Sequence, residues 1–440
     1  MLRLPLAFAL LLLAPLTSAA ARAADAPAAA AAKPPNIVLI ISDDQAWTDY
    51  GLTGHPHVRT PNIDRLAAEG LTFRRGYVPS SLCCPSLASI VTGLYPHQHK
   101  VTSNDPPVPP GVKKTDPAYQ KAFDEGRDVM NRHMDAVPTL PRLLSRHGYL
   151  TLQTGKWWQG NFAHGGFTHG MTLGKRHGDE GLKIGRQTMQ PIYDHIAEAR
   201  KQGKPFMVWY APMMPHDPHT PPAALLEKYK AVAPSIHVAR YWAMCEWFDQ
   251  TVGALVSHVD EQGLGKDTVF VFLADNGWIQ NPDAPRYAPR SKQSQYDGGI
   301  RTPIIVRWTG TVKPRQADEL ATSLDVAPTL LLAAGLKPTA EMSGLNLLDE
   351  RAVRGRTTLT GACFTHNAVD LNVPARNLRW RWVIDGDRKL ILPDPTNEPA
   401  GKPELYDLKA DPGEAKNLAG EDAETVRRLT AKLDAWWKPA

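Results

Sequence analysis

The sequence is poor in cysteine, with four among its 440 residues. This excludes a disulfide-dense scaffold, which small secreted domains use in place of a large core. Cys83 and Cys84 are adjacent, and a bond between them would be strained. Cys245 and Cys363 fall in predicted core segments, where buried thiols are the plain interpretation, although export would also permit a disulfide.

An excess of charge of one sign is also absent. Lysine and arginine total 50 against 45 aspartates and glutamates, which gives a net charge of +5 at pH 7. The chain has no basic run and no alternation of basic and aromatic residues, so we expect no nucleic-acid partner. A hydrophobic content of 42% and a charged content of 22% are typical of a globular protein.

Long apolar runs are missing except near the N-terminus. There Arg3 precedes the apolar run 4–16, and Ala21-Arg22-Ala23 offers a cleavage site with small residues at its two outer positions. We therefore expect a signal peptide over 1–24, followed by a flexible linker over 25–35. The run is too short to span a bilayer, and no cysteine follows it for lipid attachment. The expected location is exported, periplasmic or secreted, without a membrane anchor.

Short apolar runs alternate with helical patterns from residue 36 to about 336, which predicts a doubly wound, mostly parallel α/β sheet. The continuous β-branched run 37–41 indicates a strand covered on both faces. The other expected strands are 149–153, 205–210, 268–274 and 303–307, and the expected helices include 60–70 and 237–259.

The pattern changes after residue 344. Two strand-like segments, 379–384 and 389–392, flank a turn, a third covers 404–408, and helical spacing covers 421–437. We expect a main domain over 36–344 and a smaller C-terminal α+β unit over 345–440.

Acidic residues follow two of the predicted strands. Asp43 and Asp44 come directly after the first strand, and Asp275 and Asn276 follow the strand 268–274. The carboxyl ends of parallel strands share one edge of a sheet, so these side chains would meet there. Such an oxygen-rich group suits Ca²⁺ or Mg²⁺ and does not suit zinc. The alternative is that the aspartates only cap the following loops.

The segment 83–93 indicates a loop that becomes a helix, with Pro85 in the first turn and Gly93 at the end. Cys83 therefore lies at a helix N-terminus, where free amides and the helix dipole favour an anion. The residues 83–86 resemble the Cys-x-Pro-Ser-Arg signature of the type I sulfatases, which belong to the alkaline phosphatase superfamily. Four further segments extend the resemblance in order along the chain: 155–157, 211–216, 292–303 and 404–414.

The resemblance implies an alkaline phosphatase-like fold and a hydrolase of sulfate esters, acting on a sulfated carbohydrate or an aryl sulfate. In the family, a formylglycine-generating enzyme or an anaerobic maturase oxidises the cysteine to formylglycine, and a hydroxyl of the hydrated aldehyde attacks sulfur. Carried over, the catalytic residues are Cys83, Lys156, His216 and Lys292. The calcium ligands implied in the same way are Asp43, Asp44, Cys83, Asp275 and Asn276. Locally, 82–86 and 92–99 look most like N-acetylglucosamine-6-sulfatases.

Two residues depart from the family pattern. Leu87 stands where the family has the arginine that the maturing enzyme reads, and Trp158 replaces the histidine of Gly-Lys-Trp-His. Tryptophan keeps one donor but cannot act as a base. His164 and His169, close by in sequence, are candidates to stand in for that histidine.

Other candidate substrate-binding residues are His97 and His99, for which a polar loop is an equal alternative, and Trp158 itself. Two further functions remain open. One is a phosphonate or phosphodiester hydrolase on the same scaffold, and the other is a protein that binds a metal and an anion without turnover.

Overall fold

The computed structural model describes residues 1–2 and 33–439, and Pro34–Ala440 form one compact unit. The expected signal peptide, and the linker up to residue 32, lie outside the described residues. None of the helices in the described part of the chain is long and apolar enough to cross a membrane.

The unit is built on an eight-stranded sheet with the order β4-β3-β5-β1-β6-β7-β2-β8. Every neighbouring pair is parallel except those that involve β7, which runs antiparallel to both β6 and β2. The predicted doubly wound, mostly parallel sheet is therefore confirmed. The strands of this sheet are β1 (Asn36–Ser42), β2 (Leu71–Tyr77), β3 (Leu150–Gly155), β4 (His169–Gly170), β5 (Phe206–Ala211), β6 (Thr268–Ala274), β7 (Arg301–Arg307) and β8 (Arg315–Thr322).

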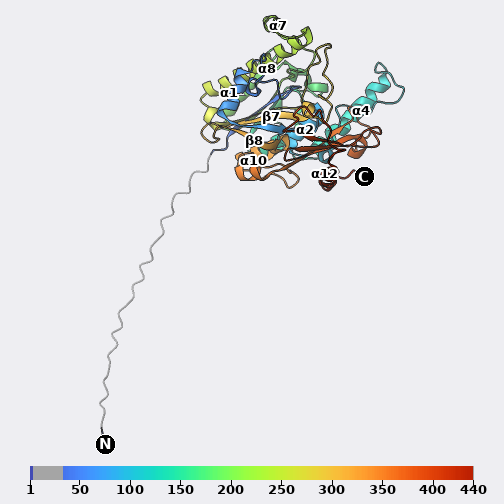
Figure 1. Ribbon diagram of the computed structural model, residues 1–440. Helices are drawn as coiled ribbons and strands as arrows, with labels where there is room; N and C mark the ends of the chain where they lie inside the picture. The colour runs from blue at the N-terminus through green and yellow to red at the C-terminus, as the bar shows by residue number, and fades with distance from the viewer. Residues whose placement is uncertain (3–32, 440) are drawn as a thin grey trace. The chain divides into compact units, whose positions relative to one another are not determined.

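Helices cover both faces of this sheet, as Figure 1 shows for α1 and α8 on one face and α2 and α10 on the other. Alternate residues of β1 enter two separate cores: Leu39 and Ile41 pack in one, and Val38 and Ile40 in the other. The helices of the unit before the second sheet are α1 (Pro61–Glu69), α2 (Cys83–Thr92), α3 (Pro96–His99), α4 (Pro117–Asp135), α5 (Leu140–Ser145), α6 (Gln190–Lys201), α7 (Ala223–Lys230), α8 (Ile236–Glu261), α9 (Asp297–Ile300), α10 (Val326–Ala333) and α11 (Glu350–Gly355).

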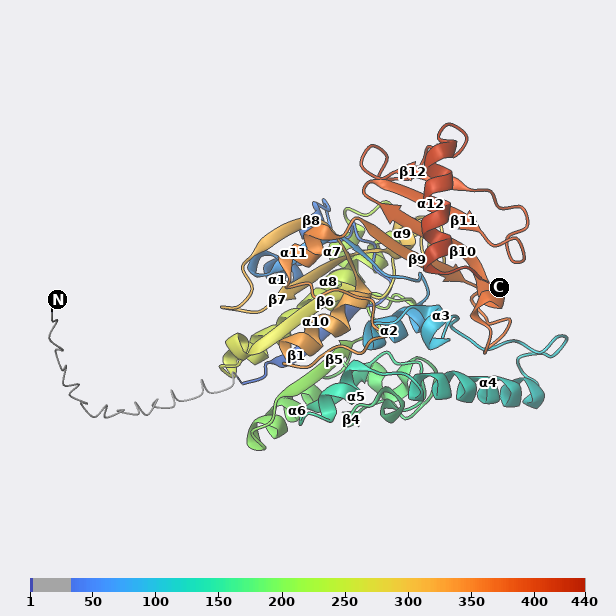
Figure 2. The ribbon, with the colours of Figure 1, turned by 90° about the horizontal axis from the view of Figure 1, so that it is seen from below.

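A second sheet of four antiparallel strands, in the order β12-β11-β10-β9, follows in the chain. Its strands are β9 (Thr358–Phe364), β10 (Leu378–Asp385), β11 (Arg388–Pro393) and β12 (Glu404–Asp407). One face packs on α12 (Ala423–Trp436), which crosses the strands in Figure 2, through Leu429 and Leu433. The expected α+β character of the C-terminal part is confirmed, while the division at 344/345 stays a prediction.

Candidate active site

The two acidic pairs meet because β1 and β6 are neighbours in register. Ser42 pairs with Ala274, so the residues that follow each strand emerge side by side. The backbone amide of Asp44 donates to Asp275 Oδ1 at 3.1 Å, and Asn276 Nδ2 donates to Asp44 Oδ1 at 2.6 Å. Both pairs are buried. The spatial prediction made from the sequence is correct for all four residues.

The N-terminus of α2 brings Cys83 to the same place. Its Sγ lies 3.8 Å from Asp44 Oδ1, and Ser86 ties the helix to β6 by donating to the carbonyl oxygen of Asp275. Burial raises the pKa of the Cys83 thiol well above its ordinary value, against the opposing effect of Lys156 and Lys292. The unmodified side chain is therefore a neutral thiol and a poor nucleophile.

Two lysines and a histidine complete the cluster. Lys156, directly after β3, donates to Asp43 Oδ1 at 2.6 Å, and Lys292 donates to Asp44 Oδ2 at 2.5 Å. His216, after β5, places Nε2 3.3 Å from Asp44 Oδ2 and 3.4 Å from Lys292 Nζ. The catalytic residues predicted from the sequence thus lie around the acidic pairs.

The charges in this buried group act on one another. Burial raises the pKa of Asp43 well above its ordinary value even though Lys156 opposes it. Burial also acts to raise the pKa of Asp44, but the neighbouring ammonium groups, Lys292 first and then Lys156, outweigh it and hold that pKa below its usual range. Burial, with Lys156 adding to it, lowers the pKa of His216 well below its ordinary value, so this imidazole is neutral at pH 7.

The oxygens of this group fit a hard divalent cation. Asp43 Oδ2, Asp275 Oδ2 and Asn276 Oδ1 are buried acceptors without a hydrogen-bond partner in the described chain. Ligand atoms of Asp43, Asp44, Cys83 and His216 also lie within 4.8 Å of one another. Unpartnered buried carboxylate and amide oxygens are costly alone and are the ligands that Ca²⁺ and Mg²⁺ prefer.

Trp158 lies beside this group and is surrounded by cations. Lys156 Nζ is 5.7 Å from its ring centroid, and the guanidinium carbons of Arg127 and Arg176 are 5.0 and 4.8 Å away. Its Nε1 is buried and has no partner among the described residues. His177 packs edge-on against the indole with ring centroids 4.4 Å apart, and its ring centroid is 6.0 Å from that of His216.

The sequence did not single out His177, because it stands outside every segment that resembles the family pattern. Leu87, the other departure from the family pattern, is 1% exposed and packs in the apolar core on the α2 side of the sheet.

The structure places the other four candidate histidines away from the buried group. His97 stacks on Trp437 with ring centroids 4.5 Å apart, and His99 Nε2 is 3.0 Å from Ser89 Oγ. His164 pairs with Asp135 at 2.9 Å, and His169 lies on β4 at the sheet edge, against His195. Each is occupied by a structural partner, so His164 and His169 gain no support as replacements for the missing histidine.

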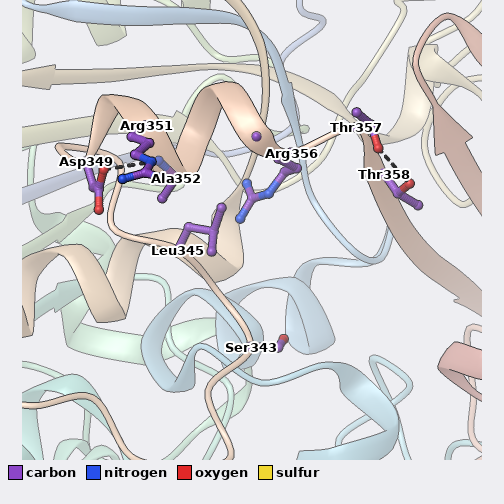
Figure 3. Close-up of a pocket in the computed structure, with 9 residues that line it drawn as sticks. Ser343, Leu345, Asp349, Arg351, Ala352, Arg356, Thr357 and Thr358 are labelled. Atoms are coloured by element: carbon purple, nitrogen blue, oxygen red, sulfur yellow. Dashed lines mark hydrogen bonds between the residues drawn. The ribbon is translucent and has the colours of Figure 1, made fainter.

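A wide surface recess of about 690 Å³ lies elsewhere, and Figure 3 shows the side chains that line it. They come from 343–345, from α11 and from the start of β9, and they share no residue with the buried group. Arg356 in this recess is already bound by Asp325 at 2.5 and 2.6 Å.

Comparison with known proteins agrees with this geometry. The Sulfatase family matches residues 35–336, and the family described as N-sulphoglucosamine sulphohydrolase, C-terminal, matches residues 290–438. The chain belongs to the sulfatase family. It is a sulfuric ester hydrolase of the type I class, within the alkaline phosphatase superfamily.

The relatives of this sulfatase include characterised enzymes. Human arylsulfatase A is 28% identical over 90% of this chain and 88% of its own length. The N-acetylgalactosamine-6-sulfatase of Rattus norvegicus is 28% identical over 70% of this chain and 64% of its own. The local likeness to N-acetylglucosamine-6-sulfatases stays a prediction.

Solved structures show the same fold. Ps i-CgsB in complex with k-i-k-neocarrahexaose superimposes with a TM-score of 0.72 at 19% identity, over 93% of this chain and 94% of that one. A structure in complex with its substrate D-glucosamine-2-N,6-O-disulfate gives a TM-score of 0.69 at 19% identity, over 92% and 97% of the two chains.

Proposed function

We propose that this sulfatase is exported and hydrolyses a sulfate ester of a sulfated glycan, with formylglycine made from Cys83 and a bound Ca²⁺. The observation that carries the proposal is the position of the Cys83 sulfur, 3.8 Å from Asp44 Oδ1 and within a group that also offers unpartnered buried oxygens. The glycan substrate is suggested by a relative named as an N-acetylgalactosamine-6-sulfatase and by a solved structure in complex with D-glucosamine-2-N,6-O-disulfate. The proposal includes a catalytic domain over 36–344 and a C-terminal subdomain over 345–440.

Five residues would hold the ion: Asp43, Asp44, Asp275, Asn276 and residue 83 in its modified form. When bound, Ca²⁺ supplies a Lewis acid at these oxygens, and formylglycine supplies a carbonyl in place of the inert thiol. With the carboxylates taken up by the ion, the ammonium groups of Lys156 and Lys292 are free to bind the oxygens of the sulfuryl group. Sulfuryl oxygens carry negative charge throughout the reaction, so fixed cations beside them stabilise the transition state.

His216 is oriented for proton transfer. Its Nδ1 lies 2.5 Å from the carbonyl oxygen of Asp217, which can only accept a hydrogen bond, so Nδ1 carries a proton. Its Nε2 faces an acceptor, Asp44 Oδ2 at 3.3 Å, and a donor, Lys292 Nζ. Lys292 Nζ is 3.4 Å from that Nε2. These two groups are placed to hold and pass the proton that the departing alcohol requires. Deep burial of the cluster also keeps bulk water away from the reacting groups.

Two measurements on the mature protein test the proposal. The chain is produced together with a formylglycine-generating enzyme, and separately with an anaerobic maturase, and the peptide that contains Cys83 is weighed by mass spectrometry. Turnover is then measured on nitrophenyl sulfate, on a nitrophenyl phosphodiester and on defined sulfated saccharides. We expect conversion of Cys83, a preference for sulfate esters, and loss of at least about 10³-fold in kcat for Cys83→Ala.

Leu87 makes conversion the point at which the proposal can fail, because leucine offers the maturing enzyme no charged group. An unmodified thiol in the native host together with no sulfate ester hydrolysis would contradict the proposal and favour a non-catalytic binding protein. A preference for the phosphodiester would favour the other alternative. Export is tested by fractionating the native host, and a chain retained in the cytoplasm at full length would contradict it.

A further inference from the structure

A recess of about 630 Å³ lies next to the buried group, on the side of His216. Its size is within the range of small-molecule sites. It is built from the loop after β5, from α7, from the first turns of α8 and from one residue of the loop before α9. Its lining includes Asp217, His219, Leu226, His237, Arg240 and Pro285.

Two chains of contact connect this recess to the reactive cluster. Asp217 lines the recess and places Oδ1 3.1 Å from His216 Nδ1. His219 packs edge-on against Trp278, with ring centroids 5.8 Å apart, and Lys292 Nζ lies 5.6 Å from the Trp278 ring. These contacts place the recess beside the side of the cluster at which Lys292 and His216 lie.

The recess carries an uncommitted positive charge. Arg240 is exposed, and its guanidinium makes no hydrogen bond or ion pair with any residue that the structure describes. His237 lies three residues earlier on α8, so both side chains project from one face of the helix. The opposite sign is supplied by Asp217 at the end near His216.

The recess also contains polar atoms without hydrogen-bond partners among the described residues. His219 Nε2 and His237 Nδ1 are buried and have no hydrogen-bond partner in the described part of the chain. Burial lowers the pKa of His219 to about 4, so its neutral ring offers a donor or an acceptor at pH 7. Leu226 and Pro285 give apolar surface beside these polar groups, the combination that a sugar ring requires.

We propose that this recess binds the leaving-group sugar of the sulfate ester, and that Arg240 binds a second acidic substituent on it or on the sugar linked to it. A carboxylate and a further sulfate share the required chemistry, because each is an anion with two oxygens that can accept paired hydrogen bonds from a guanidinium group. The inference rests on the proposed function, because it identifies the recess as the part of the same site that selects acidic glycans.

The test compares saccharides with and without a second acidic group on the mature enzyme. Inhibition of nitrophenyl sulfate hydrolysis is measured with a uronate-containing 6-sulfated chondroitin disaccharide, with its additionally sulfated form, and with N-acetylgalactosamine 6-sulfate alone. We expect the acidic disaccharides to bind about tenfold more tightly than the monosaccharide, since a charge-assisted hydrogen bond is worth roughly that factor. Tighter binding of the additionally sulfated form than of the other disaccharide would identify sulfate as the preferred anion. Equal binding of the two disaccharides would identify the carboxylate.

Arg240→Gln should remove that tenfold preference and leave kcat/KM on nitrophenyl sulfate within about twofold of the parent, because this small substrate does not reach the arginine. Arg240→Lys should keep most of the preference. The matched control is Arg65→Gln, which changes an exposed arginine on α1 that makes no ion pair among the described residues. The preference of the parent enzyme should also weaken as salt is raised, which a purely structural role of Arg240 would not produce.

Equal inhibition by the disaccharides and by N-acetylgalactosamine 6-sulfate, or an Arg240→Gln variant that loses activity equally on every substrate, would overturn the subsite. Either result leaves the proposed function standing as long as the parent enzyme hydrolyses nitrophenyl sulfate. If it does not, the proposed function fails, and the same affinity ratios measured by calorimetry still decide the subsite.

Discussion

Trp158 shows how one residue changes the character of the reactive cluster. Its indole lies among three cations, and its Nε1 is a buried donor without a partner in the described chain. A buried donor left unpaired lowers the free energy of unfolding by about 1–3 kcal/mol. The presence of this donor beside Lys156 is explained if the substrate pairs with it. Tryptophan thus supplies a donor where the family has histidine, and proton transfer falls to His216 and Lys292.

Removing that donor should therefore affect turnover more than stability. For Trp158→Phe we expect kcat/KM on nitrophenyl sulfate to fall by about tenfold, with the unfolding free energy lowered by no more than about 1–2 kcal/mol. Trp157→Phe is the matched control, because Trp157 Nε1 already donates to the carbonyl oxygen of Gln159 at 3.1 Å. An activity loss confined to the Trp157 variant would refute the role given to Trp158.

His99 acts on stability and its effect should depend on pH. The backbone amide of Val101 donates to its Nδ1 at 3.2 Å, so Nε2 carries the proton and donates to Ser89 Oγ. Burial lowers the pKa of His99 to about 3, below the unfolded value of 6.5. The stability from this neutral histidine is complete above pH 6.5 and is lost as the pH falls from 6.5 towards 3.

The measurement is the unfolding free energy across that window. The contribution of His99 should fall by up to about 1.4 kcal/mol per pH unit. His99→Gln, which cannot take up a proton, should flatten the slope. His147→Gln changes an exposed histidine and should leave the slope as it is. An unchanged slope in the His99 variant would show that the histidine titrates normally.

At the scale of elements, the second sheet is joined to the main one by a buried ionic group. Lys389 on β11 is 0% exposed and donates to Asp297 Oδ1 at 2.9 Å and to Glu414 Oε1 at 2.7 Å. Glu414 also accepts from the backbone amide of Asp297 at 2.7 Å. Asp297 begins α9, whose end leads directly into β7, so this group ties the C-terminal strands to the loop that carries Lys292.

Lys389→Met should destabilise the protein by about 3–5 kcal/mol, since it leaves two buried carboxylates without their cation. Lys416→Met is the control, because Lys416 forms a pair with Glu421 in which both side chains are more than 60% exposed. That exposed pair should contribute no more than about 1 kcal/mol. Equal midpoints in a denaturant titration of the two variants would contradict the structural role of Lys389.

Strands with continuous apolar runs could be predicted from the sequence, and strands with charged residues could not. β1 and β6 were predicted because their side chains enter cores on both faces of the sheet. β2 and β8 were missed because Arg74 and Asp318 interrupt the apolar pattern, and both lie on exposed faces towards the sheet edge. β9 was missed as well, since its short apolar residues alternate with threonine and glycine.

The same distinction separates the parts of the site. The meeting of Asp44 with Asp275 follows from two strands and the rule for their carboxyl ends, so it could be predicted. The position of His177 depends on an irregular loop in which it takes a φ of 70°, a conformation that no periodic pattern encodes. The recess around Arg240 depends in the same way on loops that connect different elements.

At the scale of the whole unit, the acidic group stands where several distant segments converge. β1, β3, β5 and β6 end at it, and α2 begins at it. A divalent ion here would bind the folded chain and not the unfolded one, because the ligands are hundreds of residues apart in sequence. Ion binding at this site should thus stabilise the folded state in addition to its role in catalysis.

Thermal unfolding in a chelator, in Ca²⁺ and in Mg²⁺ tests this directly. At a Ca²⁺ concentration a hundred times its Kd, the stabilisation should be about 2.7 kcal/mol over the chelator sample, with a smaller shift in Mg²⁺ at equal concentration. Asp275→Asn removes one carboxylate and should reduce the Ca²⁺ shift. Asp318→Asn, at a side chain that is 71% exposed, should keep it in full. Identical midpoints in chelator and in saturating Ca²⁺ would show that the two lysines alone neutralise these carboxylates, and the catalytic proposal would then lose its metal.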